Sequence, residues 1–148
     1  EKVQTLLEKL GELKNRVETM RKQIVAQDFM RDLENVPLIA GVPMLTTILR
    51  EADADLLRQM ADRFRQKFQS GVVLLASLSD GRPLLVAAVT EDLVRRGLHA
   101  GELVRHAAAI LGGSGGGKPT LAQAGGKDPA RIEEALASAR SWVQAHLV

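Results

Sequence analysis

The sequence contains no cysteine and no tyrosine, and only four of its 148 residues are aromatic. Without cysteine the chain can form no disulfide and offers neither a thiol nucleophile nor a thiolate zinc ligand, which suits a reducing compartment such as the cytoplasm. Four aromatic side chains are too few for a platform on which nucleic-acid bases stack. No apolar run approaches the roughly 18 residues that a membrane-spanning helix needs. We therefore expect a cytoplasmic protein without disulfides or membrane spans.

The rest of the composition is typical of a folded protein, with 45% hydrophobic and 26% charged residues. The length predicts about one domain. A net charge of +2 permits a nucleic-acid partner without requiring one, because binding depends on local clusters of charge. Glycine is unevenly distributed, since seven of the 13 glycines lie between Gly112 and Gly126. Residue 1 is not methionine and already lies in a periodic pattern, so we expect the chain to be part of a longer protein.

An apolar seam with the spacing of a coiled coil dominates the N-terminal segment. It predicts a coiled-coil-like helix from residue 1 to about Glu34, within a segment 1–35 that ends before Pro37. Its members are spaced by three and four residues: Val3, Leu6, Leu10, Leu13, Val17, Met20 and Ile24. The flanking heptad positions e and g hold basic residues: Lys2, Lys9, Lys14, Arg16 and Arg21.

These flanking charges oppose self-association, because either a parallel or an antiparallel homodimer would bring like charges together. Two interpretations of the helix stay open. Its polar face is solvated, or its partner is a different helix or a polyanion.

Residues 36–148 predict an α/β (α+β) fold, a compact domain of sheet and helices that follows the long helix. We expect strands at 42–49, 72–78, 83–89 and 121–124, with a hairpin turn at Ser79–Arg82. Helices are expected at 54–68 with Asp53 as N-cap, at 90–97 with Thr90 as N-cap, at 100–111, and from Asp128-Pro129 onward. Both hairpin strands are almost wholly apolar, so both faces of the sheet should be covered.

The helix expected at 54–68 has a basic outer face, on which Asp62 is the acidic residue. The basic side chains are Arg58, Arg63, Arg65 and Lys67. A solvated surface explains such a face, and so does contact with phosphate groups.

The glycine-rich loop expected over residues 112–127 matches two catalytic motifs only superficially. Gly112, Gly117 and Lys118 fit a P-loop, but Pro119 replaces the Ser or Thr that would bind magnesium. Gly112, Ser114 and Gly116 fit a nucleophile elbow, which needs a strand before it, whereas this segment follows a helix. Two interpretations remain. Successive backbone N–H groups form a flexible cradle for an anion, or glycine permits a tight turn between a helix and a strand.

Other chemistry is scarce in this sequence. His99, His106 and His146 have neither the spacing nor the cysteine companions of a metal site. His106 is better explained as a packing or surface residue than as a base. The acidic pairs Glu91-Asp92 and Glu133-Glu134 fall in the first turns of helices, where the helix dipole explains them. We expect no catalytic residues and no metal site in this chain.

The segment GGSGGGKPTLAQAGGKDPARIEEALASARSW, residues 112–142, resembles the C-terminal domain of bacterial alanyl-tRNA synthetase. The resemblance covers about residues 42–145 and is most specific in the glycine block, in Lys118-Pro119 and in Ala122–Gly126. The wider group is the DHH-associated domain, which also occurs in DHH-class phosphoesterases, where the block resembles Gly-Gly-Gly-His. Lys118 and Pro119 stand here where that histidine is expected, and a long helix replaces the catalytic module, so the synthetase branch is favoured.

The resemblance implies a non-catalytic fragment that docks the elbow of alanine tRNA and so serves both aminoacylation and editing. The parent enzyme would use ATP, magnesium and zinc, but none of these cofactors is expected in this fragment. Its partners would be tRNA, the remainder of the synthetase chain and, as in some members of the family, a second copy of itself. An elbow presents shape and phosphates, which lysine, arginine and backbone amides can bind. The expected contacts are Gly115, Gly116, Gly117 and Lys118, supported by Lys127, Arg63 and Lys67.

Other functions stay open at this point. The fragment could be a dimerisation or structural module of the same enzyme. It could also be the nucleotide-binding domain of a DHH-class phosphoesterase, or belong to a free-standing alanyl-tRNA editing protein.

Overall fold

A mixed sheet of six strands forms the centre of the structure, a computed structural model that describes residues 2–147. The elements in chain order are α1 (Lys2–Asp32), β1 (Leu38–Ile39), β2 (Val42–Ile48), α2 (Ala54–Lys67), β3 (Val72–Ser79), β4 (Arg82–Val89), α3 (Glu91–Arg95), α4 (Ala100–Ile110), β5 (Ser114–Gly117), β6 (Leu121–Gly125), the 3₁₀ turn η1 (Pro129–Arg131) and α5 (Ile132–His146). None of the helices in the described residues is both long and apolar enough to cross a membrane.

The strand order across the sheet is β1-β2-β3-β4-β6-β5. Strands β2 and β3 are parallel, since α2 connects them as a crossover, and the remaining neighbours are antiparallel. The turn between β3 and β4 contains Asp80 and Gly81, both with positive φ, as expected of the two-residue turns that suit hairpin twist. The glycine-rich strand β5 therefore lies at one edge of the sheet.

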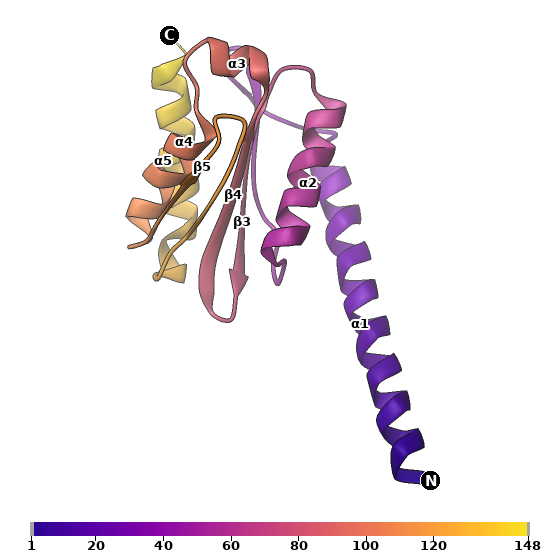
Figure 1. Cartoon of the computed structure of the whole chain (residues 1–148). Coiled ribbons are helices and arrows are strands. Elements are labelled where there is room, and N and C mark those ends of the chain that lie inside the picture. The colour runs from indigo at the N-terminus through magenta and orange to yellow at the C-terminus, as the bar shows by residue number, and fades with distance from the viewer. Residues whose placement is uncertain (1, 148) are drawn as a thin grey trace.

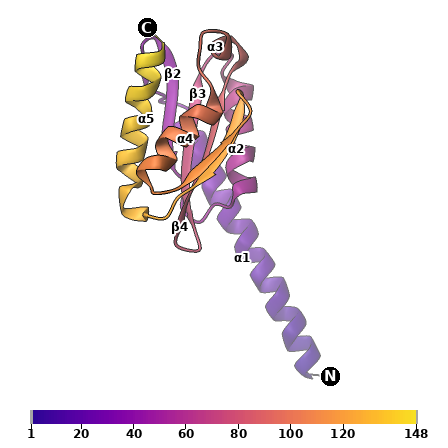
Figure 2. The ribbon, with the colours of Figure 1, turned by 60° about the vertical axis from the view of Figure 1, so that its left-hand side comes forward.

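Helices cover both faces of the sheet, because alternate residues of each strand point to opposite sides (Figures 1 and 2). On one side Val72 and Leu74 of β3 pack with α4 and α5. On the other side Val73 and Leu75 pack with α2 and the C-terminal end of α1. The buried residues of α2 on this side are Leu56, Leu57, Met60, Ala61 and Phe64.

Helix α1 joins the domain only through its C-terminal end and then projects away from it (Figure 1). Phe29 and Leu33 are buried in the core beside α2. Thr47 of β2 donates a hydrogen bond to the Asp32 carboxylate at 3.0 Å. Residues 2–24 are all exposed, so most of α1 has no contact with the domain that carries it.

The predicted fold class is confirmed, as are the hairpin of β3 and β4 and the covered sheet. Asp53 caps α2 as predicted, because its carboxylate accepts a hydrogen bond from the Leu56 N–H at 2.8 Å. Helix α1 ends at Asp32, two residues before the predicted end. The predicted start at residue 1 lies outside the described residues.

Three predictions about local structure need correction. The two-residue strand β1 was not expected, because so short a segment has no periodicity. Thr90 stands at the N-cap position of α3 as predicted, but its side chain makes no cap hydrogen bond to the backbone of the helix. Its hydroxyl instead accepts from the Gly71 N–H at 3.1 Å and donates to Asp92 at 2.5 Å. The predicted glycine loop is largely strand, since Ser114–Gly117 and Leu121–Gly125 pair as β5 and β6.

Candidate nucleic-acid interface

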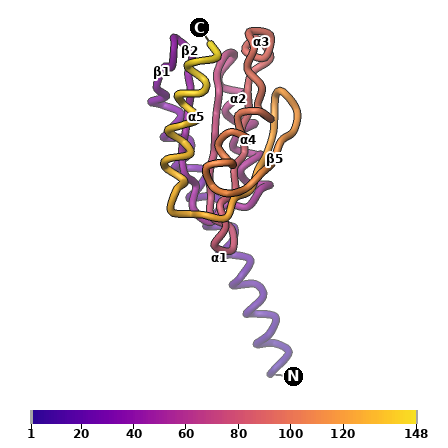
Figure 3. Tube along the Cα trace, turned by 90° about the vertical axis from the view of Figure 1, so that its left-hand side faces the viewer, coloured from indigo at the N-terminus to yellow at the C-terminus, as the bar shows by residue number. Residues whose placement is uncertain are grey.

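The glycine-rich segment forms a β-hairpin at the edge of the sheet (Figure 3). The Lys118 N–H donates to the Leu121 carbonyl at 2.9 Å, so the turn consists of Pro119 and Thr120. In an antiparallel ladder, residues directly opposite each other alternate between hydrogen-bonded and non-hydrogen-bonded pairs. Lys118 and Leu121 form a hydrogen-bonded pair, so Gly116, two residues earlier, directs its N–H and carbonyl toward β6. The N–H and carbonyl groups of Gly115 and Gly117 point away from β6.

The outward-facing residues are Gly115 and Gly117. No strand lies beyond β5 in the part of the chain that the structure describes. The outer side of β5 is therefore an edge that presents backbone N–H groups without side chains in front of them. Such an edge can be approached closely by an anion such as a phosphate group.

Close packing of β5 against α4 and β6 explains why Gly101 and Gly115 are glycine. A Cβ at Gly101 of α4 would lie 2.9 Å from the Gly117 carbonyl oxygen, and a Cβ at Gly115 would overlap Ala124 of β6. Both contacts leave no room for a methyl group. The glycines therefore belong to a paired strand beside a helix, and the anion cradle stays a prediction.

Gly116 differs from its neighbours because a basic side chain lies beside it. The Nη2 atom of Arg105, exposed on α4, would be 3.3 Å from a Cβ at Gly116. Arg105 is not among the residues that the sequence predicts for the site. Its position ten residues before the glycines gives no signal of this proximity, which depends on how α4 packs on β5.

Lys118 and Lys127 lie at opposite ends of the hairpin. Next to Lys118, the Pro119 carbonyl accepts from the N–H of Ala100 at the start of α4, at 2.8 Å. The Lys127 N–H donates to the carbonyl of Leu111 at the end of α4, also at 2.8 Å. Since α4 has 11 residues, the two ends are about 15 Å apart. The two lysines are both exposed and extend the positive charge along the hairpin.

At the open end of the hairpin, a second basic side chain joins Lys127. Arg82, at the start of β4, lines the same groove as Lys127, Gly125 and Gly126. Arg82 was also missed by the sequence analysis, because it belongs to a different hairpin, that of β3 and β4.

Helix α2 carries four basic residues, of which Arg58 lies beside β6. The Arg58 guanidinium donates to the Gln123 side chain of β6 at 2.7 Å and also bonds to Asp55. Arg65 forms an ion pair with Asp62. The predicted contacts Arg63 and Lys67 are exposed, and among the described interactions neither takes part in an ion pair. Arg63 follows Leu56, which lines the pocket beside α1, by two helical turns, so Arg63 and Lys67 lie on the side of α2 toward α1 and away from Arg58 and β6.

The three histidines serve local structure. His99 caps α4, since its Nδ1 accepts from the Glu102 N–H at 3.2 Å. His106 shares a hydrogen bond of 2.8 Å with the Ser138 hydroxyl, as expected of a packing residue. His146 stacks on Trp142. No three His, Asp or Glu side chains within residues 2–147 gather closely enough to hold a metal ion.

One carboxyl group near the tip of the hairpin is held in its charged form. Hydrogen bonds from Ser70 and Thr90 lower the pKa of Asp92 below its ordinary value of 3.8. Asp92 and Thr120 line the same depression between the C-terminal end of α2 and the start of α3. Through Thr90, which also accepts from the Gly71 N–H, this carboxylate helps to join the connection before β3 to the one after β4.

Comparison with known proteins places this geometry in a family. The family model of the DHHA1 domain matches residues 41–145. An alanine–tRNA ligase of Oceanobacillus iheyensis is 39% identical over 97% of this chain, and one of Geobacillus kaustophilus is 42% identical over 94%. The chain corresponds to only 16% of the length of each of these relatives.

Solved structures show the same fold. The C-Ala domain of Aquifex aeolicus alanyl-tRNA synthetase superposes with a TM-score of 0.69 and 27% identity, covering 74% of this chain and 98% of that one. RecJ of Thermus thermophilus, solved with Mg²⁺, has a TM-score of 0.58, covers 91% of this chain and 20% of that one, and at 16% identity shows the fold alone. The chain therefore belongs to the DHHA1 domain family, and it is similar to the C-Ala domain of alanyl-tRNA synthetase.

Proposed function

We propose that this chain is the C-terminal tRNA-binding domain of an alanyl-tRNA synthetase and docks the elbow of alanine tRNA for aminoacylation and editing. The observation that carries the proposal is strand β5. It presents the backbone N–H groups of Gly115 and Gly117 at an open edge, with Lys118 at the tip and Arg105 alongside. No side chain of β5 stands between these groups and a sugar–phosphate backbone.

The chemistry of this surface suits the outside of a folded RNA. Phosphate oxygens accept hydrogen bonds from backbone N–H, lysine and arginine groups without any reading of base edges. The scarcity of aromatic residues is consistent with recognition of backbone and shape. Arg63 and Lys67 on α2 are exposed and would offer two further basic groups to the RNA.

The relatives named alanine–tRNA ligases support a place in that enzyme. Under this proposal the activation of alanine with ATP and magnesium, and zinc-dependent editing, belong to parts of the synthetase outside these 148 residues. The partners would then be alanine tRNA and the rest of the synthetase, in the cytoplasm.

Direct binding of tRNA to matched variants tests the proposal. Lys118→Ala combined with Lys127→Ala should weaken binding of alanine tRNA by roughly tenfold, because each lost phosphate contact removes an ion pair and its released counterions. The control is Lys2→Ala with Lys9→Ala, which removes the same charge from the projecting part of α1 and should leave affinity unchanged. Equal affinity of the hairpin variant and the wild type would contradict the placement of the site.

Two rival functions give different results in the same experiment. A purely structural module would bind no tRNA in either form. A nucleotide-binding module of the phosphoesterase type would bind mononucleotides or short oligonucleotides as well as it binds tRNA.

A further inference from the structure

The edge of the sheet opposite to β5 is only partly paired. Strand β1 covers just the start of β2, since Leu38 pairs with Pro43 and the Pro37 carbonyl accepts from the Met44 N–H at 2.9 Å. Pro37 has no N–H to donate in return, so the ladder between β1 and β2 ends at this residue. Within the described part of the chain, residues 45–48 of β2 have no strand beside them on this side.

Two residues of this free edge direct their backbone groups outward. The Leu49 N–H donates to the Ala76 carbonyl of β3 at 2.8 Å, whereas the Met44 N–H points to β1. Successive residues of a strand alternate in the side to which their backbone groups point, so Thr46 and Ile48 point away from β3. Among the described residues neither has a backbone hydrogen bond on that side. Their N–H and carbonyl groups can therefore pair with an added strand, as when extended peptides bind a sheet edge.

A groove of about 540 Å³ runs along this edge, between β2 and α5. Ile48, Leu136 and Ala137 provide its apolar lining. Helix α5 also contacts β1, the strand outside β2, so α5 lies over the edge itself (Figure 3). A strand added to β2 would lie beneath α5 and place alternate side chains in this groove.

The groove holds one charged side chain of each sign, both from α5. Arg140 donates from Nη1 to the Thr46 hydroxyl at 2.6 Å, and within the described residues it takes part in no ion pair. Glu133 is exposed and lines the same groove. Two helical turns separate it from Arg140, which places the two residues about 10 Å apart along one side of α5.

The order of these charges along β2 follows from the topology. Strands β2 and β3 run in parallel toward the turn between β3 and β4. Arg82, which follows that turn, lines a groove together with Lys127, which precedes α5. Helix α5 therefore begins at the end of the sheet at which β2 ends, and Glu133 lies toward Ile48.

A second copy of this chain does not fit the free edge. Neighbouring strands lie about 4.8 Å apart, whereas two packed helices need about 8–10 Å between their axes. Pairing β2 with β2 of another copy would bring two α5 helices together above the joined edges, closer than they can pack. The occupant is therefore an extended segment that has no covering helix at this place.

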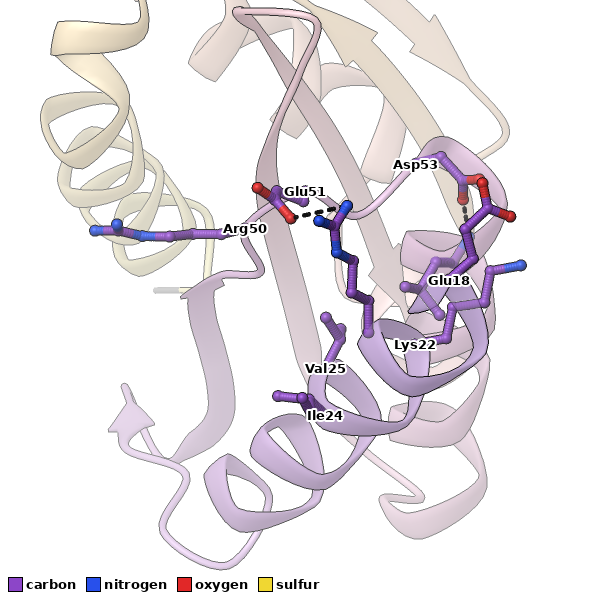
Figure 4. A pocket seen from close by; sticks show the side chains of 9 residues that line it. Glu18, Lys22, Ile24, Val25, Arg50, Glu51 and Asp53 are labelled. Atoms are coloured by element: carbon purple, nitrogen blue, oxygen red, sulfur yellow. Dashed lines mark hydrogen bonds and ion pairs between the residues drawn. The ribbon is translucent and has the colours of Figure 1, made fainter. Parts of the chain in front are cut away.

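Another hollow, of about 330 Å³, lies between α1 and the segment that leads into α2 (Figure 4). Arg21 on its rim already pairs with Glu51 at 3.7 Å, and Asp53 caps α2. None of the residues that line it belongs to a strand, so it offers no free backbone edge. The groove beside β2 is therefore the better site for an extended peptide.

We propose that the free edge of β2 binds an extended segment of another protein, which adds an antiparallel strand to the sheet. The segment carries a basic residue and, two positions later, Asp or Glu. An antiparallel strand passes Ile48 before Thr46, so its basic residue faces Glu133 and its carboxylate faces Arg140. Antiparallel pairing is also the more stable arrangement per residue.

A segment from a separate chain reaches this edge directly. Helix α1 has 31 residues and carries its first residue about 45 Å along its axis, so a segment that precedes α1 would have to retrace that length. The free edge of β2 lies at the opposite side of the sheet from β5. Failure of this inference would therefore leave the proposed tRNA contacts untouched.

Two matched peptides of seven residues test the inference, with Thr or Val at all positions except the third and fifth. One carries Lys and then Glu, and the other carries Glu and then Lys. Fluorescence anisotropy with the full 148-residue chain should show one bound peptide per chain and about tenfold tighter binding of the first peptide, because repulsion replaces both ion pairs in the second. Amide hydrogen exchange followed by NMR should slow at Thr46 and Ile48 and stay unchanged at Thr47, which faces β3.

Methylation of peptide nitrogens distinguishes strand pairing from attraction between side chains alone. N-methyl groups on the Lys and Glu of the first peptide, whose N–H groups face β2, should abolish binding. An N-methyl group on the residue between them, whose N–H faces away from β2, should change the affinity by less than about twofold.

Variants of the chain locate the binding surface. Glu133→Lys with Arg140→Glu should reverse the preference between the two peptides. Thr46→Pro removes an outward N–H and should abolish binding, whereas the control Thr46→Val keeps that N–H and should bind within about threefold of wild type. Thermal unfolding of each variant checks that the domain is folded. Equal binding of both peptides, binding of neither, equal loss from both methylation patterns, or a dimer of the chain through β2 would overturn the inference.

Discussion

Gly115 and Gly116 are adjacent in β5, yet a side chain would meet different surroundings at each. At Gly115 a Cβ would overlap Ala124 on the paired strand, where backbone and methyl group cannot move apart without opening the sheet. At Gly116 the nearest atom is the far end of the Arg105 side chain, at 3.3 Å. A flexible guanidinium can yield, so at Gly116 a methyl group displaces a side chain rather than a strand.

We predict that Gly115→Ala lowers the free energy of unfolding by about 1–3 kcal/mol, the usual cost of forcing an extra methyl group into close packing. Gly116→Ala, the matched control, should change it by less than about 0.5 kcal/mol. Urea unfolding followed by circular dichroism measures both. Equal stability of the two variants would show that α4 and β6 do not enclose β5 as described.

The cap of α4 gives a second prediction for a single residue. Replacing His99 by Ala removes the acceptor for the Glu102 N–H and should cost about 1 kcal/mol of stability. His99→Asn, which also offers a side-chain acceptor suited to an N-cap, should recover most of the loss. If both variants unfold like the wild type, the cap contributes nothing to α4.

A pH-dependent contribution is expected from Asp92. Its pKa is lowered in the folded state, chiefly by hydrogen bonds from Ser70 and Thr90, so the ionised carboxylate favours folding. The contribution is complete above the unfolded pKa near 3.8 and is lost as the pH falls through the lower folded value. Asp92→Asn should therefore be less stable than wild type at pH 7, with a difference that shrinks as the pH falls below 3.8 and disappears below the folded pKa of Asp92. A difference that persists unchanged at low pH would exclude this ionic origin.

At the scale of elements, the sequence predicted the helices and turns that have a clear residue pattern, but not the strand that depends on its neighbours in the fold. Helix α2 has both a cap at Asp53 and a repeated apolar face, and the turn at Asp80-Gly81 has residues that tolerate positive φ. Strand β5 has neither a pattern nor favourable propensity, because glycine is a poor strand former on its own. It is a strand because β6 pairs with it and α4 covers it. Arg105 and Arg82 lie near the glycines only because the chain folds, so the sequence could not identify them. Lys118 could be recognised because it follows the glycines directly in the sequence.

The two ends of helix α1 are expected to contribute differently to the stability of the domain. Deleting residues 1–20 should leave the unfolding of the domain nearly unchanged, because these residues make no contact with the core. Phe29→Ala should cost about 3–5 kcal/mol, since its side chain is fully buried beside α2. Thermal unfolding of both variants provides the comparison. A large loss on deletion would show that the exposed part of α1 is packed against the domain in solution.

At the scale of the whole molecule, the hairpin of β5 and β6 and the exposed part of α1 lie on separate parts of the structure (Figure 1). The edge of β5 presents backbone N–H groups with basic side chains nearby, whereas the exposed apolar residues of α1 belong to a helix that projects from the domain (Figure 1). The N-terminal end of α1 lies far from the hairpin of β5 and β6 in all three views (Figures 1, 2 and 3).

The salt dependence of tRNA binding tests the central claim most directly. An interface that neutralises about four phosphates should give a slope of about −3 in a plot of log affinity against log salt. Between about 50 mM and 200 mM salt, the affinity for alanine tRNA should then fall by about 60-fold. The slope for the Lys118→Ala, Lys127→Ala variant should be shallower, because this variant neutralises about two fewer phosphates. Absent binding, or an affinity that does not change with salt, would contradict the account of this domain as a phosphate-binding dock for tRNA.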